Sequence, residues 1–452
     1  MRSPMIVRTG GLLAAFGLLV LQGCATSAQK SAGMRDMLAH GRPDHALMEV
    51  EKDAETDDVM VNMNLGILRA MNGKFEASNT ALEIAKNKIQ ELYSTSVTEQ
   101  AAAVLVNDET ISFDGDRYEQ VLVHAYKALN YVALGDLDAA RVEILQSDAK
   151  MMEWGDSPEE DPFMRYLAGI VFEALGEKDD AMVWYRNAIK VYKATKSRHG
   201  LNIPTQLKKD LLRLLAEAKL WGEYKDTKKR LGMSNWKPLK NKGKGEVILI
   251  MNNGLTPQRD QMIMTQHSPV MAGEIKIALP TYPNPPAYVD QMRVSANGRS
   301  TIMETVENID GLARAALDDD IAAITVRAVA RAVAKKTTEK ELGDNGGAYA
   351  GFMQLGMMIM NQATEIADTR GWNTLPQEIQ ISRLYLPAGQ HTLRVEVIGH
   401  GGAIRDVMNI PVNVKVGGKT IINKYWTGPR PIAATIPGGG VITGPGEGVI
   451  TN

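Results

Sequence analysis

The sequence contains a single cysteine, Cys24, among its 452 residues. One thiol cannot form an intramolecular disulfide, so the folded chain depends on its packed core. A structural zinc site needs cysteine or histidine ligands at short spacing, and the sequence offers none. The 7 histidines are scattered, and the chain has no HExxH pair, GxSxG elbow or GxxxxGK phosphate loop. We therefore expect no metal, no cofactor and no enzymatic activity.

The best catalytic candidates are Asp260, His267 and Ser268 in the segment GLTPQRDQMIMTQHSP. These residue types can supply an orienting carboxylate, a base and a nucleophile, and a loop after a strand is a common place for them. Their closeness in sequence is weak evidence, because catalytic groups are recognised by their geometry and not by their position in the chain. If the protein were an enzyme, its fold would have to bring these three residues together.

Neither sign of charge is in excess. The chain has 51 Lys and Arg against 53 Asp and Glu, and its formal net charge is −2. Proteins that bind nucleic acid usually carry a basic surface, because the phosphate backbone dominates their affinity. The balance of charge therefore excludes nucleic acid as an expected partner. With 44% hydrophobic and 23% charged residues, the chain has the composition of an ordinary globular protein of about two or three domains.

The N-terminal residues have the order of a secretory signal. Two arginines precede the apolar run 12–21, and small residues follow it. This run is shorter than the ~20 residues that a permanent transmembrane helix needs. The segment Leu-Gln-Gly-Cys at 21–24 resembles the lipobox of bacterial lipoproteins. The resemblance implies that residues 1–23 are removed, that acyl chains on Cys24 hold the protein on a membrane, and that Ala and Thr at 25–26 direct it to the periplasmic face of the outer membrane.

The first half of the chain contains recurring units of helix, turn and helix. Their turns fall at Gly41, Gly73, Gly135 and Gly176, and a small residue follows each glycine after five positions. Glycine adopts positive φ without strain, so it can end the first helix of each unit. The pattern resembles the tetratricopeptide repeat (TPR), whose stacked hairpins form a solenoid with a concave face that can hold a peptide or a partner helix. A generic helical bundle is the alternative.

Small residues let the two helices of a hairpin approach closely, and larger residues fill the groove between successive hairpins. The positions that match the repeat pattern, and that we expect to support partner binding, are Gly66, Ala128, Tyr131, Ala140, Gly169, Phe172, Ala181 and Tyr185. The spacing of the units is irregular, and the longest interruption contains AAAVLVNDETISF, a strand or a loop. A fifth and weaker hairpin is expected around Gly222.

The second half of the chain has the pattern of a β-rich domain. The continuous apolar run EVILIMNN predicts a buried central strand. Asn297 and Gly298 predict a two-residue hairpin turn, and ISRLYLPAGQHTLRVEVIG predicts a hairpin around Pro-Ala-Gly. Apolar residues alternate further on, at Met408, Ile410, Val412, Val414 and Val416. We expect an antiparallel sandwich or barrel in which each sheet has one apolar face.

Two helical stretches separate the two groups of predicted strands. The first has an apolar stripe formed by Leu317, Ile321, Ile324 and Ala328. The second, GGAYAGFMQLGMMIMNQATEIAD, is apolar on most sides. In it, Gly347 and Gly351 have the spacing that lets two helices touch, and methionines such as Met353 and Met357 adapt to an irregular partner. This stretch is either the central helix of its domain or a helix that mediates self-association or touches a membrane.

These patterns predict an α+β protein, an all-α TPR-like solenoid followed by a β-rich, sandwich-like domain with inserted helices. The predicted segments are a signal peptide at 1–23, a lipidated tether at 24–33, the helical repeats at 34–232, a linker at 233–245, the β-rich domain at 246–428 with its helical insertion at about 305–369, and a flexible tail rich in Gly and Pro at 429–452.

The Cys24 motif, the repeats, and the segments GEVILIMNNGLTPQRDQ, TRGWNTLP and RLYLPAGQHTLRV together resemble an uncharacterised family of TPR-containing outer-membrane lipoproteins of Gram-negative bacteria. The resemblance implies association with other small lipoproteins, including ones similar to activators of penicillin-binding proteins, and it carries over no catalytic residue. We predict a scaffold that binds periplasmic protein partners through its repeats. One alternative is a subunit of an assembly for peptidoglycan-synthesis regulation or export, a homo-oligomer formed through the Met- and Gly-rich helix. Another is a module that binds cell-wall polysaccharide through loops 258–267 and 282–288.

Overall fold

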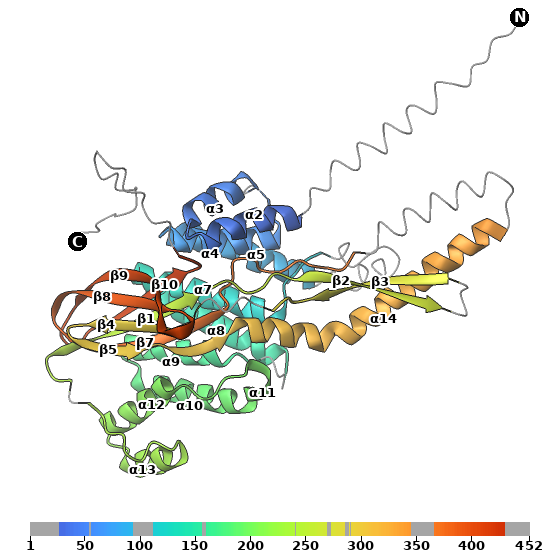
Figure 1. The fold of residues 1–452 in the computed structure, drawn as a ribbon. Coiled ribbons are helices and arrows are strands. Elements are labelled where there is room, and N and C mark those ends of the chain that lie inside the picture. The colour runs from blue at the N-terminus through green and yellow to red at the C-terminus, as the bar shows by residue number, and fades with distance from the viewer. Residues whose placement is uncertain are drawn as a thin grey trace, which may run out of the picture.

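The computed structural model describes residues 27–429, except for 54–55, 94–111, 156–159, 240, 269–272, 285–288, 290 and 345–365. Helices fill the first half of this range and strands dominate the second, so the fold is α+β. Figure 1 shows the helices stacked beside a pair of sheets, with an arm formed by one long helix and a hairpin.

The helices of the first half follow one another through short turns. They are α2 (Ser27–Ala39), α3 (Pro43–Val50), α4 (Val59–Met71), α5 (Phe75–Tyr93), α7 (Arg117–Leu134), α8 (Leu137–Glu153), α9 (Pro162–Leu175), α10 (Lys178–Ala194), α11 (Lys196–His199), α12 (Thr205–Glu217) and α13 (Trp221–Arg230). The helix α2 begins at Ser27, so part of the segment predicted as a tether is helical.

Each predicted turn glycine lies between the two helices of one hairpin. Gly41, Gly73, Gly135 and Gly176 have φ values of 65°, 73°, 80° and 88°, a region that glycine enters without strain. This prediction is confirmed. The fifth hairpin is present as α12 and α13, but it turns at Lys219, which has a φ of 59°, and Gly222 lies inside α13.

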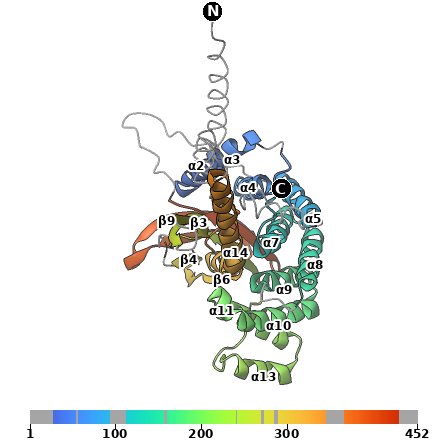
Figure 2. The same ribbon diagram turned by 90° about the vertical axis from the view of Figure 1, so that its right-hand side faces the viewer.

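The helices are arranged in an inner and an outer layer. Figure 2 shows α4, α7 and α9 on the side of the sheets, with α5, α8 and α10 outside them. Nearly every residue of α9 from Pro162 to Glu173 is buried, whereas α8 buries only one face. The inner helices are therefore covered on both sides, by their own hairpin partners and by the second half of the chain.

The strands of the described residues form three sheets. They are β1 (Lys244–Asn253), β2 (Asp260–Ser268), β3 (Gly273–Thr281), β4 (Gln291–Ala296), β5 (Arg299–Ile302), β6 (Glu304–Asn308), β7 (Glu378–Pro387), β8 (Gly389–Ile398), β9 (Ile404–Val414) and β10 (Lys419–Trp426). Two sheets have four strands each, in the orders β10-β1-β7-β6 and β5-β4-β8-β9, and the third pairs β2 with β3. The long helix α14 (Ile309–Asp344) follows β6.

The two larger sheets pack face to face, and the first of them also packs on the helices. Val247, Leu249 and Met251 of β1 belong to the core between the sheets. Ile248 and Ile250 of the same strand belong to the core shared with the helices. A strand buried on both faces reads as a continuous apolar run, so the predicted central strand is confirmed.

Two details of the predicted sandwich are wrong. The segments on either side of Pro-Ala-Gly do not pair as a hairpin, because β7 pairs with β1 and β8 pairs with β9. Their apolar side chains, among them Leu384 and Val395, meet across the core instead. The sheets are also not wholly antiparallel, since β10 runs parallel to β1.

Shorter patterns were predicted more reliably. Asn297 and Gly298 have φ values of 53° and 72° and connect β4 to β5, so the predicted hairpin is confirmed. The residues at 408, 410, 412 and 414 are buried as expected. Val416 is 65% exposed, because β9 ends at Val414 and the chain then turns toward the other sheet.

The strands β2 and β3 stand apart from the sandwich. They pair with each other in register from Asp260 with Thr281 to Ser268 with Gly273. The helix α14 packs against β3, and Figure 1 shows α14 and this hairpin extending together away from the body. We call α14 and the β2–β3 hairpin the arm. Within the described residues, no helix is both long enough and apolar enough to cross a membrane.

Candidate functional site

The predicted repeat positions lie inside the helical layers. A Cβ on Gly66 would lie 2.4 Å from Leu82, and a Cβ on Gly169 would lie 2.2 Å from Tyr185. These two glycines therefore let each inner helix approach its outer partner. Three alanines at matching positions are fully buried, namely Ala128, Ala140 and Ala181. Phe172 is 7% exposed and packs on Trp184, with ring centroids 5.9 Å apart, and Tyr131 is partly buried.

The inner face of the repeats is in contact with the chain's own second half. The loop before β7 lies against it: the backbone N–H of Trp372 donates to Glu119 at 2.7 Å, and that of Thr374 donates to Asn64 at 3.2 Å. Tyr126 of α7 packs edge-on against Trp372 at 5.7 Å and donates its hydroxyl to Asn252 of β1 at 3.0 Å. The concave face that we expected to hold a partner is therefore occupied here by a segment of the same chain.

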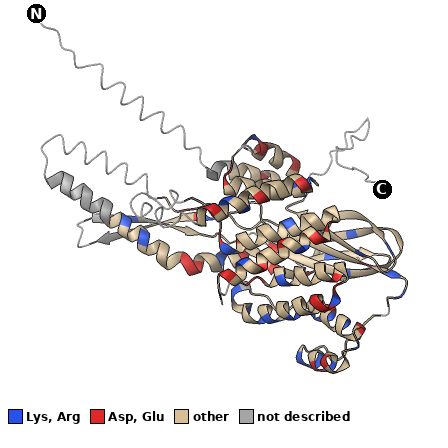
Figure 3. Ribbon diagram, turned by 180° about the vertical axis from the view of Figure 1, so that it is seen from behind, with Lys and Arg blue, Asp and Glu red and all other residues tan. Residues whose placement is uncertain are grey.

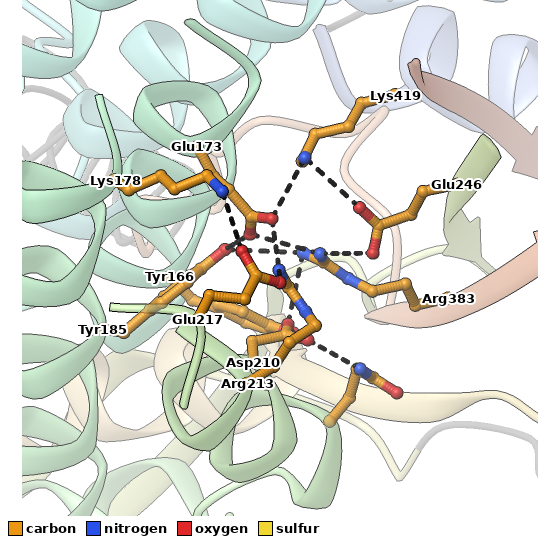
Figure 4. Close-up of polar contacts among 11 residues, drawn as sticks. Tyr166, Glu173, Lys178, Tyr185, Asp210, Arg213, Glu217, Glu246, Arg383 and Lys419 are labelled. Atoms are coloured by element: carbon orange, nitrogen blue, oxygen red, sulfur yellow. Dashed lines mark hydrogen bonds and ion pairs between the residues drawn. The ribbon is translucent and has the colours of Figure 1, made fainter. Parts of the chain in front are cut away.

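A group of buried ions joins the repeats to the first sheet, and Figure 4 shows it. Its centre is Arg383 of β7, whose side chain is 0% exposed. The guanidinium lies 2.7 Å from Glu246 of β1, 3.2 Å from Glu173 of α9 and 3.2 Å from Asp210 of α12. We call Arg383 with its partners the junction network, which comprises Tyr166, Glu173, Tyr185, Asp210, Arg213, Glu246, Arg383 and Lys419.

The remaining members of the junction network complete its hydrogen bonds. Arg213 donates to Glu173 at 2.7 Å, and Tyr185 donates its hydroxyl to the other oxygen of Glu173 at 2.7 Å. Tyr166 donates to Asp210 at 2.7 Å. Lys419 of β10 lies 3.3 Å from Glu173 and 3.6 Å from Glu246. Three strands and three helices thus contribute to one cluster of paired charges.

The charges of the junction network set the pKa values of its carboxyl groups. Burial alone would raise the pKa of Glu173, but the positive charges of Arg383, Arg213 and Lys419 outweigh it and hold that pKa far below its usual range. Burial raises the pKa of Asp210 despite the opposing effect of Arg383. Glu173 is therefore ionised and matched by cations, as a buried charge must be.

The sequence contains a signal for this network, which the prediction of the repeats and strands does not include. Arg383 follows Ile379 and Ile381 on the same face of an alternating strand, and Glu246 precedes Ile248 and Ile250 in the same way. A charged residue on an otherwise apolar face implies a buried partner of opposite charge. The identity of that partner depends on segments far apart in the chain, so the pattern predicts a buried pair without naming it.

A polar cavity of about 310 Å³ lies at the base of the arm. Its lining combines the segment before α7, the start of β2, the end of β3 and one face of α14, with residues that include Phe113, Asp116, Arg259, Asp320, Arg327 and Asp368. Arg259 pairs with Asp116 at 2.5 Å and lies over the ring of Tyr282 at 5.6 Å. Burial raises the pKa of neighbouring Glu119 to about 7, with a further contribution from the charge of Asp116.

The catalytic candidates do not converge. Asp260 begins β2 and Ser268 ends it, so Asp260 and His267 are separated along an extended strand by about 23 Å. Among the described residues, no group of three or more His, Cys, Asp or Glu side chains could hold a metal ion. The polysaccharide alternative relied on loops 258–267 and 282–288. The first of these is mostly strand β2, and the second falls partly outside the described residues.

Several predicted residues lie outside the described residues. These are the lipidation site Cys24 and the self-association residues Gly347, Gly351, Met353 and Met357. The AAAVLVNDETISF segment is outside them almost entirely, and the tail is outside from residue 430. Their predicted roles stay predictions.

No family model matches the sequence, and no curated protein matches it. Solved structures of helical repeat proteins do resemble part of it. MamA from AMB-1 has 16% sequence identity and a TM-score of 0.29, and the match covers 45% of this chain and 95% of that one. MamA from Desulfovibrio magneticus RS-1 has 13% identity and a TM-score of 0.30, covering 46% and 98%.

A kinesin light chain from Podospora anserina with nearly identical TPR-like repeats has 13% identity and a TM-score of 0.32, covering 45% of this chain and 92% of that one. At this level of similarity the three matches carry no conclusion about what the present chain binds. The assignment of its repeats depends on the hairpins, turn glycines and close helix contacts described above.

Proposed function

We propose that this protein is a lipid-anchored, non-enzymatic scaffold on the periplasmic face of the outer membrane, which binds a protein partner through its arm. The anchor rests on the sequence pattern around Cys24. Because the described part of α2 begins at Ser27, only Ala25 and Thr26 would separate a lipidated Cys24 from the helix, a distance of at most about 10 Å. The body would then lie directly beside the membrane, and the arm would be held near it.

The observation that carries the partner-binding role is the exposure of β2. Its residues Met262, Ile263 and Met264 are 47%, 59% and 48% exposed. Consecutive strand residues point to opposite faces, so β2 presents apolar side chains that are about half exposed on both of its faces. Within the described chain β2 pairs only with β3. The segment from Gln261 to Gln266 carries no charge, and charges are a common protection of an edge strand against pairing.

An edge strand of this kind fits an extended segment of another protein. The partner's backbone would pair with the free edge of β2, and its apolar side chains would cover the methionines and Ile263, as in other cases of strand addition. A carbohydrate would instead need polar and aromatic side chains placed for its hydroxyl groups. The inner face of the repeats is already filled, so the arm offers the more accessible surface.

A photo-crosslinking amino acid at position 263 in intact cells tests the partner role. We expect a discrete crosslinked product that contains another protein. The same amino acid at Val183, which is 50% exposed on the outer helix α10, is the matched control and should not give that product. If position 263 gave no adduct, only a dimer of this chain, or the same products as position 183, partner binding through β2 would be rejected.

The anchor is tested separately by mass spectrometry of the native protein. We expect the chain to begin at Cys24 with acyl chains attached, and Cys24→Ala to release the protein from the membrane fraction. An unmodified thiol or an intact segment 1–23 would reject the anchor. That result would leave the crosslinking result at position 263 unaffected, so the two parts of the proposal can fail independently.

A further inference from the structure

The last hairpin of the repeats ends in a helix that the rest of the molecule covers little. Among the residues of α13, only Thr227 is buried. Figures 1 and 2 both show this helix at the end of the molecule opposite α2. We call residues 219–237 the tip; they comprise the turn before α13, the helix itself and the segment that follows it. A terminal repeat needs a polar outer face, so a polar helix is expected at this place.

The tip carries a positive charge that the chain as a whole lacks. Residues 219–237 contain six Lys and Arg against two Asp and Glu, whereas the formal net charge of the chain is −2. One of the two acids, Glu223, is already matched, because Arg186 of α10 donates to its two oxygens at 2.8 and 3.0 Å. Figure 3 shows α13 at the lower end of the molecule, with its Lys and Arg in blue. Five of the six cations are exposed, namely Lys219, Lys225, Lys229, Arg230 and Lys237. The tip therefore attracts anions.

Two large apolar side chains are exposed among these cations. Leu220 is 42% exposed and Trp221 is 53% exposed, and both directly follow Lys219 in the turn that begins α13. The ring of Tyr224 packs edge-on against Trp221, with centroids 6.0 Å apart, and Lys228 lies over the ring of Tyr224 at 5.6 Å. The indole is thus held in place and still exposed. A polar cap requires neither Leu220 nor Trp221, so their exposure needs a further explanation.

Trp221 and two of the lysines share one side of α13. Trp221, Lys225 and Lys229 follow one another at intervals of four residues, and residues four apart are neighbours on the surface of a helix. Thr227 and Leu231 lie on another side and are only 1% and 7% exposed. The exposed side therefore combines an indole with cations. This combination is typical of helices that lie in a membrane surface, where Trp and Leu enter the boundary of the acyl chains and Lys contacts anionic headgroups.

We propose that the tip binds the surface of a bilayer that contains anionic phospholipid. Leu220 and Trp221 enter the headgroup region, and Lys219, Lys225 and Lys229 contact the phosphates around them. An acidic protein could also match the lysines. The observations favour a bilayer, because it offers anionic groups and an apolar interior within a few ångströms of each other, and here the apolar side chains adjoin the cations directly. The contact weakens as salt is added, because salt screens the attraction between charges.

The proposed anchor gives this contact a consequence. Acyl chains on Cys24 would attach the chain near α2, and the tip would attach it at the opposite end of the molecule. The two contacts together hold the repeats along the membrane, and an anchor supported by a basic patch is more stable than either signal alone. This orientation rests on the proposed function, whereas lipid binding by the tip does not.

Binding of the purified full-length chain to lipid vesicles tests the tip. All samples carry Cys24→Ala, so that none is lipidated and any contribution of residues 1–23 is common to them. Vesicles of phosphatidylcholine are compared with vesicles that also contain phosphatidylglycerol. Lys225→Gln with Lys229→Gln should lower the partition coefficient for the anionic vesicles at least about tenfold and leave that for the neutral vesicles unchanged. The matched control is Lys190→Gln with Lys193→Gln, two exposed lysines of α10, which should change the coefficient less than about twofold.

Quenching by brominated acyl chains tests the insertion of Trp221. We expect brominated phosphatidylglycerol vesicles to quench the part of the tryptophan fluorescence that Trp221→Phe removes. No quenching of this part would overturn the proposal, as would equal binding to neutral and anionic vesicles or an equal loss in the control pair.

Soluble polyglutamate is the probe for an acidic protein surface. If it bound the chain through Lys225 and Lys229 while the anionic vesicles did not bind, the partner would be an acidic protein and the bilayer would be rejected. A native protein without acyl chains on Cys24 would reject the anchor and leave these results unchanged, so the tip and the anchor can fail separately.

Discussion

Two regions of the molecule differ in how their side chains are covered. One is the junction between the repeats and the first sheet, and the other is the projecting arm. At the junction, ionic groups from two helices and three strands are paired around Arg383, whose side chain is 0% exposed. On the arm, Ile263 and Val326 are apolar and remain 59% and 68% exposed. The charged groups of the junction find their partners within the same chain, whereas these apolar side chains of the arm remain exposed to solvent. The difference shows that the inner face of a repeat array can be occupied by the same chain while another surface of the molecule stays exposed.

The junction and the arm also differ in how much their side chains contribute to the free energy of unfolding. A buried ion pair contributes little net stability compared with apolar residues of similar volume, but removing one partner leaves an uncompensated charge and is costly. Exposed apolar residues on the arm contribute little to folding, because most of their surface stays in water. Substitutions should therefore separate the two regions by their effect on the free energy of unfolding.

The largest effect is expected for Arg383→Met. It leaves Glu173, Asp210 and Glu246 buried with only Arg213 and Lys419 to balance them. We expect the free energy of unfolding to fall by about 3–5 kcal/mol, measured by denaturant unfolding at pH 7. Lys419→Met is the control, since Lys419 is 20% exposed at the edge of the same network and should lose less. A loss below about 1 kcal/mol for Arg383→Met would mean that the network does not hold the two halves together.

Local patterns in the sequence predicted the parts of the structure that depend on local geometry. The turn glycines and the Asn297-Gly298 hairpin were predicted because a positive φ is a property of a few adjacent residues. The β1 strand was predicted because burial on both faces leaves an uninterrupted apolar run. These features place the helices and strands that carry the candidate site, but they do not show which side chains meet there.

The parts of the structure that the sequence did not predict depend on pairings between distant segments. Nothing near Pro-Ala-Gly tells whether β7 continues into a hairpin or crosses to the opposite sheet, because the partner of β7 is β1, more than a hundred residues away. The ion pair of Arg383 with Glu173 and the hydrogen bond from Trp372 to Glu119 join residues 210 and 253 positions apart. The filling of the inner face by Trp372 and Thr374 could not be predicted for the same reason.

A second prediction uses the pH dependence of stability. The pKa of Glu119 is raised by burial from 4.5 to about 7 in the folded chain. Between these two values the unfolded chain loses its proton while the folded chain keeps it, so the free energy of unfolding falls as the pH rises. The total fall attributable to Glu119 is about 3 kcal/mol, and it is complete above pH 7.

Glu119→Gln should remove this part of the slope when unfolding is measured by denaturant at several pH values from 5 to 8. The absolute stability of the variant is not the criterion, because glutamine keeps only one oxygen to accept from Asp116 and Trp372. If wild type and variant had parallel profiles across this range, Glu119 would be ionised in the folded protein, and its surroundings beside Trp372 would be better hydrated than its burial indicates.

The smallest effect is expected on the arm, where it sharpens the comparison most. Ile263→Lys places a charge on an edge that now has none between Gln261 and Gln266. Since the side chain it replaces is 59% exposed, the free energy of unfolding should change by no more than about 0.5 kcal/mol. The same substitution should abolish capture of the partner at neighbouring Met262 by a photo-crosslinking amino acid, because a lysine on an edge strand opposes pairing. A stability loss comparable to that of Arg383→Met would instead make β2 part of the folded core, and the arm would then differ from the junction only in position.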